Sequence, residues 1–143
     1  MIYTDVLVIG SGISGLSYAL KIAQQRPDTR ITIITKSDDE ESSTKYAQGG
    51  VAVVTNFEKD SFDKHIEDTL RAGDGLCKRE VVEIVVKEGP ERIREMVEWG
   101  ANFDKDEFQS YDLGREGGHT ENRVVHHKDI TGAEIERALL QAV

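Results

Sequence analysis

The first fifteen residues place a glycine-rich turn between an apolar segment and an amphipathic one. The run Val6-Leu7-Val8-Ile9 is followed by Gly10-Ser11-Gly12-Ile13-Ser14-Gly15, which has the pattern G-x-G-x-x-G, and apolar residues then recur at helical spacing up to Pro27. In this pattern the first glycine permits a tight turn, the second lets the backbone approach a pyrophosphate, and the third lets helix and strand pack closely. A glycine-rich turn without a ligand is the alternative, but the pattern stands in the strand-to-helix context that phosphate binding requires. The segment therefore predicts a turn that binds a dinucleotide through backbone N–H groups.

A second apolar run, from Arg30 to Thr35, completes a strand–turn–helix–strand unit. Two strands connected by a helix are expected to pair in parallel, and short runs of β-branched residues are typical of strands buried on both faces of a sheet. A doubly wound sheet usually has five or six such strands, and this sequence contains two. The sequence therefore predicts an α/β fold, the N-terminal part of a Rossmann-type domain, with residues 1–143 as a partial dinucleotide-binding domain.

The segment after Val54 is predicted to be mostly helical. Apolar spacing indicates a helix over residues 62–70 that stops at Gly73, a second helix near 81–86 that breaks at Gly89-Pro90, and a third over 93–97 that ends at Gly100. Residues 104–123 lack apolar periodicity and are expected to form a loop, and residues 122–126 a strand. Thr131 and Glu134 have the spacing of a capping box, which predicts the start of a last helix.

Composition excludes several classes of protein. The 143 residues carry a formal net charge of -9, which weighs against a nucleic-acid partner. No apolar run approaches the length of a membrane span, and no signal peptide precedes the first strand, so a cytoplasmic protein without a membrane partner is expected. The single cysteine, Cys77, is interpreted as a packing residue in a reducing compartment. Four histidines and one cysteine show no metal-ligand spacing, so no metal site is predicted.

The end of the second strand bears on which dinucleotide is bound. Nicotinamide cofactors usually meet an acidic residue there, but this sequence has Thr35-Lys36. The departure weakens the prediction of a nicotinamide cofactor. Lys36 could donate a hydrogen bond to a ribose or ring of the ligand, or could be solvated, and its position favours neither.

A second glycine-containing segment follows the charged stretch after Lys36. The run Ser43-Thr44-Lys45-Tyr46-Ala47-Gln48-Gly49-Gly50 resembles the flavin-binding loop of the succinate dehydrogenase, fumarate reductase and L-aspartate oxidase family. Four further blocks, at 65–70, 72–73, 115–119 and 126–132, resemble the family in the same order. The resemblance implies that FAD is the cofactor, bound by the glycine turn, by Lys36 and by residues 43–50. The glycine N–H groups would lie near the isoalloxazine edge, where negative charge develops on reduction.

Two positions within the resemblance separate the branches of the family. The dehydrogenase and quinol-linked fumarate reductase branches are similar in having a flavin-linking histidine, and Ser43 occupies that position here. A serine cannot form that bond, so FAD is expected to be noncovalent. The motif Arg115-Glu116-Gly117-Gly118-His119 resembles the oxidase branch, which implies that Glu116 orients the substrate by pairing with its ammonium. Arg115 or His119 could contact a substrate carboxylate or serve a structural ion pair, and His126 and His127 carry a weaker signal.

The function that the resemblance implies is the oxidation of L-aspartate to iminoaspartate, with oxygen or fumarate as the electron acceptor. In the family this is the first step of NAD biosynthesis through quinolinate, so a functional link to quinolinate synthase is implied. The capping and C-terminal helical domains of the family are expected to lie outside this chain, which alone should be inactive. Two alternatives stay open: a flavoprotein subunit of succinate dehydrogenase or fumarate reductase, and a nucleotide-binding module without catalysis.

Overall fold

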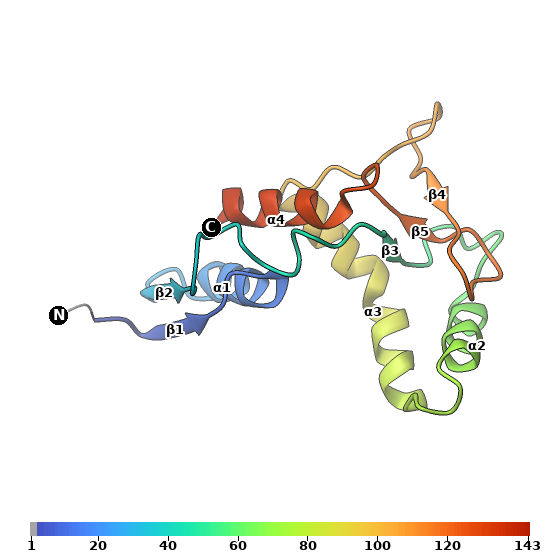
Figure 1. Cartoon of the computed structure of the whole chain (residues 1–143), viewed down its shortest axis with the longest axis horizontal. Coiled ribbons are helices and arrows are strands. Elements are labelled where there is room, and N and C mark those ends of the chain that lie inside the picture. The colour runs from blue at the N-terminus through green and yellow to red at the C-terminus, as the bar shows by residue number, and fades with distance from the viewer. Residues whose placement is uncertain (1–2) are drawn as a thin grey trace.

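A computed structural model describes residues 3–143 of the chain. Strand β1 (Val6–Ile9), helix α1 (Ile13–Gln25) and strand β2 (Ile31–Ile34) follow one another at the N-terminus (Figure 1). The two strands pair in parallel, with Val6 opposite Ile31 and Ile9 opposite Ile34. The helix ends two residues before Pro27, a residue that cannot continue it. The predicted strand–turn–helix–strand unit is therefore confirmed.

The prediction that the first strand is buried on both faces is wrong for this chain. Only Val8 of β1 is buried, on the side of the sheet that faces α1, while Leu7 and Ile9 are 53% and 80% exposed. Helix α1 covers one face of a sheet that has only two strands here, and no other described element packs on the opposite face. The apolar run thus marks a surface that this part of the chain leaves open.

A second, smaller sheet lies at the other end of the molecule. Its strands are β3 (Val51–Ala52), β5 (Val124–Val125) and β4 (Leu113–Gly114), in that order and antiparallel. The strand expected within residues 122–126 is confirmed as β5. The segment expected to be a continuous loop contains β4, because Gly114 pairs with Val124 across the bend at 115–123.

Helix α3 (Arg79–Glu98) is one continuous helix, so the predicted break at Gly89-Pro90 is wrong. Pro90 removes one backbone hydrogen bond, but the helix is held on both sides of it, since Val86 is buried against helix α2 (Phe62–Ala72) and Ile93 in the main core. Gly89 has a packing role, because a Cβ there would lie 3.2 Å from a methyl group of Val53. Tertiary packing overrides the local signal to end the helix.

Helix α4 (Thr131–Ala142) begins where expected, but the predicted capping box does not form. The residue before the helix, Ile130, makes no side-chain cap. The Thr131 hydroxyl accepts the N–H of His127 at 3.0 Å, and the Glu134 carboxylate accepts the N–H of Asn102 at 2.7 Å. Hydrogen bonds with Arg137 and then Asn102 lower the pKa of Glu134 to about 2. Both side chains connect α4 to neighbouring segments instead of capping it.

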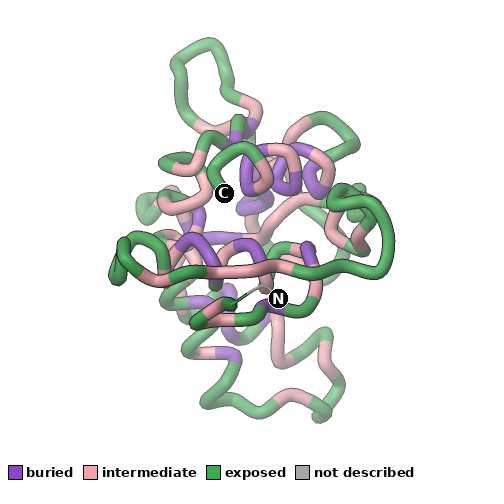
Figure 2. The backbone as a smooth tube through the Cα atoms, turned by 90° about the vertical axis from the view of Figure 1, so that its left-hand side faces the viewer, coloured by how far each residue is buried: buried purple, intermediate pink, exposed green. Residues whose placement is uncertain are grey.

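The main core lies where α1, α4 and the second half of α3 meet the small sheet (Figure 1). Figure 2 shows the buried segments gathered in the interior and the exposed loops around them. A second cluster joins α2 to the first half of α3 through Ile66, Val82 and Val86. This arrangement holds α4 beside α1, and therefore beside the glycine turn.

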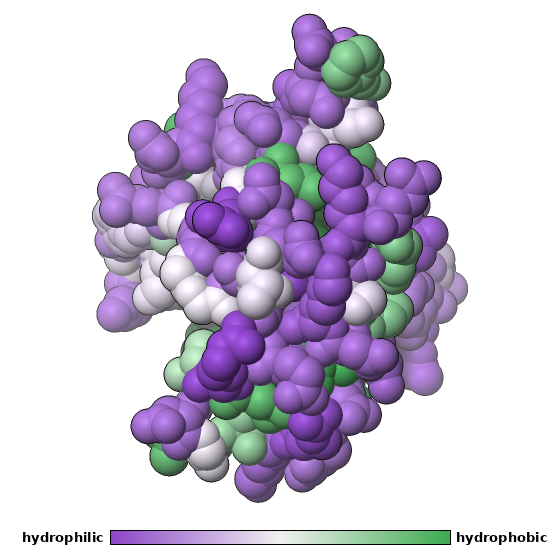
Figure 3. All heavy atoms as spheres, turned by 90° about the vertical axis from the view of Figure 1, so that its right-hand side faces the viewer, coloured by the Kyte–Doolittle hydropathy of each residue, from purple (hydrophilic) through white to green (hydrophobic). Residues whose placement is uncertain are grey.

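The face with α2 is mostly hydrophilic, with apolar side chains in several separate patches (Figure 3). Leu76, Val81, Ile84 and Val85 are among the exposed apolar residues. No helix within residues 3–143 is long and apolar enough to cross a membrane. Within the same residues no group of histidine, cysteine and acidic side chains is arranged to hold a metal ion.

Candidate functional site

The glycine turn between β1 and α1 has the backbone geometry that its sequence predicts. Gly10 has a φ of +108°, a conformation that L side chains rarely adopt, and its N–H donates to the carbonyl of Ile34 at 2.8 Å. A Cβ on Gly15 would overlap the carbonyl oxygen of Gly10 and lie 3.2 Å from the Val8 side chain. The first glycine therefore makes the turn, and the last lets α1 pack closely against β1.

The start of α1 is open to a ligand. Its N-cap, Gly12, makes no side-chain hydrogen bond, and the first turn contains no acidic residue. The hydroxyl of Ser11, which is 4% exposed, has no hydrogen-bond partner within residues 3–143. Free N–H groups and the positive end of a helix dipole favour an anion. These features fit the pyrophosphate of a dinucleotide.

The predicted flavin loop lies directly against this turn. The hydroxyl of Thr44 accepts the N–H of Ile13 at 3.0 Å, and a Cβ on Gly12 would lie 3.3 Å from the same oxygen. Ser42, which lies just outside the predicted loop, accepts the N–H groups of Thr44 and Lys45 at 3.1 and 3.3 Å. Two segments separated by 31 residues thus form one surface.

The start of helix α4 packs against the predicted flavin loop. The N–H of Gly132 donates to the carbonyl of Ala47 at 2.9 Å, and a Cβ there would overlap the carbonyl oxygens of Thr44 and Ala47. Glu136, one turn further along, is 2% exposed, and its carboxylate has no hydrogen-bond partner within the described residues. Burial raises the pKa of Glu136, while the Ser42 hydroxyl beside it opposes that rise. Nothing in the spacing of α4 indicates these contacts in advance.

The remaining predicted loop residues lie on the surface. Lys36 is exposed two residues beyond the end of β2, at the same edge of the sheet as the glycine turn, and has no hydrogen bond within residues 3–143. Lys45 pairs with Glu40 at 3.1 Å, and the Tyr46 hydroxyl donates to Glu41 at 2.8 Å. Ser14, Ser43 and Gln48 are also exposed. The side chains of Lys45 and Tyr46 therefore contact the acidic stretch.

The structure brings Glu116 to the two glycines of the loop. Its carboxylate accepts the N–H of Gly50 at 3.3 Å, across 66 residues of sequence. A Cβ on Gly49 would lie 3.1 Å from the same carboxylate oxygen. A Cβ on Gly50 would overlap the carbonyl oxygen of Val125, so this glycine lets the loop pack against β5. Glu116 and the end of the predicted flavin loop thus share one site.

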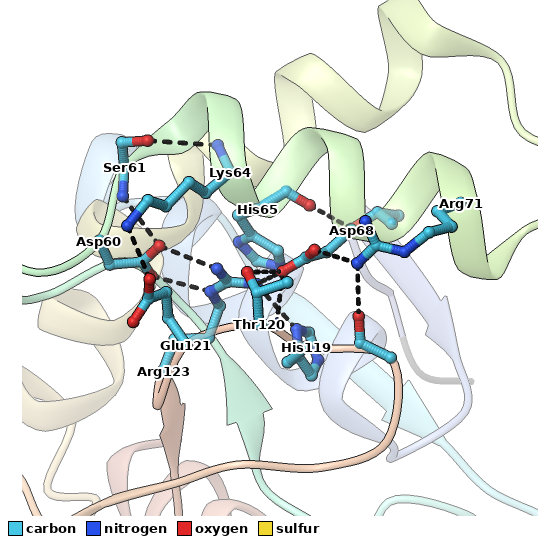
Figure 4. A network of polar contacts seen from close by, with 12 residues as sticks. Asp60, Ser61, Lys64, His65, Asp68, Arg71, His119, Thr120, Glu121 and Arg123 are labelled. Atoms are coloured by element: carbon cyan, nitrogen blue, oxygen red, sulfur yellow. Dashed lines mark hydrogen bonds and ion pairs between the residues drawn. The ribbon is translucent and has the colours of Figure 1, made fainter.

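A buried ion cluster anchors the turn that carries Glu116 (Figure 4). The Arg123 guanidinium, 0% exposed, donates two hydrogen bonds to Asp60 at 2.8 Å each and one to Asp68 at 2.7 Å. Asp68 also accepts both the N–H and the hydroxyl of Thr120 at 2.8 Å. Burial alone would raise the pKa of Asp68, but these hydrogen bonds hold it well below its usual range. Residue spacing alone does not show that three charges distant in the sequence meet, so this cluster was not predicted.

The other candidate residues, His126, His127 and Arg115, lie in surroundings different from those of Glu116. His126 lies with its Nδ1 3.2 Å from a carboxylate oxygen of Asp104, and His127 with its Nδ1 3.6 Å from the other oxygen. Arg115 is exposed and has no ion pair within residues 3–143. It lines an open hollow of about 1220 Å³ together with residues of the 55–59 and 105–113 segments. That hollow does not include the glycine turn or Glu116.

The fold and this site define the class of the protein as a dinucleotide-binding domain with a flavin-type loop. A family model described as an FAD binding domain matches residues 5–143. The chain therefore belongs to this family of FAD-binding domains, which confirms the cofactor predicted from the sequence.

Curated relatives and solved structures agree with this family. L-aspartate oxidase 2-b, chloroplastic, of Nicotiana tabacum is 53% identical over 99% of this chain and 21% of its own length. L-aspartate oxidase of Yersinia pestis is 41% identical over 96% of this chain and 26% of its own length. A quinol fumarate reductase chain of E. coli has a TM-score of 0.90 at 32% identity, over 97% of this chain and 24% of its own length. Mycobacterium smegmatis Sdh1 has a TM-score of 0.87 at 37% identity, over 97% and 23%. The chain thus spans about a fifth to a quarter of these relatives.

Gly12→Val is expected to remove most of the FAD from the full-length protein. A Cβ on Gly12 would already lie in tight contact with the Thr44 hydroxyl, at 3.3 Å, and valine would add two methyl groups at the N-terminus of α1, where the pyrophosphate is expected. At least about tenfold weaker FAD binding is expected, which corresponds to 1.4 kcal/mol or more. The measurement is the flavin-to-protein absorbance ratio after gel filtration. Gln25→Val, which puts the same side chain on the exposed last turn of α1, should keep its flavin. Normal flavin content in Gly12→Val would refute the role of the turn.

Proposed function

We propose that the full-length protein is a flavoprotein oxidoreductase that oxidises L-aspartate to iminoaspartate and passes the electrons to oxygen or fumarate. The observation that carries the proposal is the position of the Glu116 carboxylate, at the two glycines that end the predicted flavin loop. Relatives named L-aspartate oxidase at 41–53% identity support the same assignment. The activity belongs to a protein several times longer than this chain.

The residues of this chain would bind and orient both molecules. The N–H groups at the start of α1 and the Ser11 hydroxyl would hold the pyrophosphate, and Thr44 would keep the loop against the turn. When bound, FAD supplies the acceptor for the hydride that leaves Cα of the substrate. Glu116 would accept hydrogen bonds from the substrate ammonium, a group that succinate lacks, so the site would prefer an amino acid over succinate. The dehydrogenase-type subunit is the alternative that the same test addresses.

The test is flavin reduction in the full-length protein under anaerobic conditions. Adding L-aspartate should bleach the flavin absorbance, and adding fumarate afterwards should restore it, because fumarate accepts the electrons. Succinate should bleach it far less, since it offers no ammonium to Glu116. Bleaching by succinate with no response to aspartate would favour a succinate dehydrogenase or fumarate reductase subunit. No bleaching by either dicarboxylate would favour a nucleotide-binding module.

We also propose that the FAD is noncovalent, because Ser43 occupies the position of the linking histidine in the dehydrogenase branch. Acid denaturation of the full-length protein should release all of its flavin into the supernatant. The check is flavin fluorescence of the protein band on a denaturing gel, which should be dark. A fluorescent band would mean that another residue forms a covalent bond to the cofactor.

The cellular setting belongs to the same proposal. An enzyme that supplies iminoaspartate would work upstream of quinolinate synthase in NAD biosynthesis. A cytoplasmic location is proposed from the composition, although the Nicotiana tabacum relative is named as chloroplastic.

A further inference from the structure

His119 is held by the buried ion cluster on one side of its ring (Figure 4). Its Nδ1 lies 3.0 Å from a terminal nitrogen of the Arg123 guanidinium, which also donates to Asp68. A guanidinium has five N–H donors, no acceptor, and stays protonated in proteins. The Nδ1 of His119 must therefore accept this hydrogen bond and carry no proton. A neutral imidazole with a bare Nδ1 has its proton on Nε2.

The opposite ring nitrogen is free to bind a ligand. Nε2 of His119 has no hydrogen-bond partner within residues 3–143. It is also not buried, so it is accessible at the surface. The neighbouring ring of His65, 5.6 Å away between centroids, packs edge-on, and burial first and Arg123 second lower the pKa of His65 to about 4. His65 is therefore neutral at physiological pH and adds no charge beside the His119 ring.

The turn that carries His119 is fixed in place on α2. Both polar groups of Thr120 bond to Asp68, and Arg71 donates to the carbonyl of Gly118 at 3.4 Å. The N–H of His119 itself donates to the carbonyl of Glu116 at 3.3 Å. The turn thus presents a carboxylate, which can only accept hydrogen bonds, and an imidazole N–H, which can only donate.

We propose that His119 binds a carboxylate of the substrate through its Nε2–H, in a tautomer that Arg123 fixes. The inference rests on the proposed function, which places the substrate beside Glu116. An amino acid carries an ammonium that needs acceptors and a carboxylate that needs donors, and Glu116 and His119 supply one of each. Because the Nε2–H tautomer has no acceptor facing outward, His119 cannot take the ammonium. Arg123 acts as a positioning residue, since it contacts the imidazole and not the substrate.

Two substitutions test the roles of the two ring nitrogens of His119 one at a time. In His119→Asn the amide oxygen can replace Nδ1 as the acceptor for Arg123, but no donor reaches the Nε2 position. In His119→Gln the amide nitrogen can reach that position as a donor, while the acceptor for Arg123 is lost. In the full-length enzyme, His119→Asn should keep the wild-type melting temperature and raise KM for L-aspartate about ten- to a hundred-fold, with a smaller change in kcat. His119→Gln should melt at a lower temperature and recover part of the affinity.

Fumarate distinguishes this role from that of Glu116. Fumarate has carboxylates but no ammonium, so His119→Asn should raise KM for fumarate in the reductive direction as well as KM for aspartate. A wild-type KM for both substrates in His119→Asn would overturn the proposal. So would equal losses of affinity in the Asn and Gln variants, since a structural role alone would not distinguish donor from acceptor.

The tautomer can be measured without substrate. Full-length holoenzyme labelled with ¹⁵N-histidine should show, in two-bond ¹H–¹⁵N correlation spectra, one imidazole protonated only on Nε2 whose signals disappear in His119→Asn. Protonation on Nδ1 would overturn the inference. Failure of the proposed function would appear differently, as a wild-type flavin that L-aspartate does not bleach.

Discussion

Glu116→Gln in the full-length enzyme is expected to lower kcat/KM for L-aspartate by about 2–5 kcal/mol, or some 30-fold to several thousand-fold. The substitution removes the negative charge that would pair with the substrate ammonium. It keeps the shape of the side chain and an amide oxygen that can still accept the N–H of Gly50. The loop should therefore stay in place, and the loss of kcat/KM should result from the missing negative charge alone. Steady-state rates of aspartate oxidation measure it.

Fumarate reduction in the same variant is the control, because fumarate has no ammonium to lose. Its kcat/KM should change much less than that for aspartate. A folding defect would depress both reactions together. Equal losses, or an unchanged rate with aspartate, would mean that Glu116 serves only to hold the Gly49–Gly50 segment. The proposed substrate would then rest on similarity to relatives alone.

Arg123→Met is expected to lower the free energy of unfolding by about 3–5 kcal/mol, as measured by urea denaturation of the full-length protein. The substitution leaves Asp60, which is 4% exposed, without its cation. Asp68, which is 3% exposed, keeps only its pair with the more exposed Arg71. Burial alone would raise the pKa of each carboxyl. Hydrogen bonds from Arg123 keep the pKa of Asp60 lowered, and hydrogen bonds from Thr120 first and then Arg123 keep that of Asp68 lowered. Methionine fills a similar volume, so the loss should come from the stranded charges more than from a cavity.

Arg79→Met is the matched control, because Arg79 pairs with Glu67 on the surface, where the two side chains are 54% and 60% exposed. Such pairs contribute little to stability, so the denaturation midpoint should not move measurably. Adding Asp60→Asn to Arg123→Met should recover part of the loss by removing one stranded charge. A midpoint unchanged by Arg123→Met would show that the cluster does not stabilise the fold.

The unit from β1 to β2 could be predicted from the sequence because its determinants are local. A positive φ at residue 10 needs glycine, Gly15 packs against a residue five positions earlier, and Pro27 ends the helix whatever surrounds it. The loop at 43–50 and the FAD cofactor were predicted from a pattern of residues, and the family confirms the cofactor. The role of each loop residue stays a proposal.

Predictions that depended on distant partners failed. The continuity of α3 through Pro90 depends on two hydrophobic clusters formed by other elements, and the polar pair at Thr131 and Glu134 bonds to segments outside α4 instead of capping it. The exposure of one face of β1 depends on which elements pack there, and no element within residues 3–143 does so. Local propensity is weak compared with such packing, so spacing alone could not decide these points.

The sequence by itself thus determined the glycine turn and the parallel strand pair, and it predicted which residues bind a flavin and an amino acid. Only the tertiary structure decided how these residues meet. The Thr44 hydroxyl accepts the N–H of Ile13, the Glu116 carboxylate accepts the N–H of Gly50, and the His119 ring accepts a hydrogen bond from the buried Arg123. The physical reason is the range of the interactions. Backbone conformation is set by neighbours along the chain, whereas the Thr44 and Glu116 contacts join residues 31 and 66 positions apart. Arg123 can position the nearby His119 only because Asp60, 63 residues away, holds it in the interior.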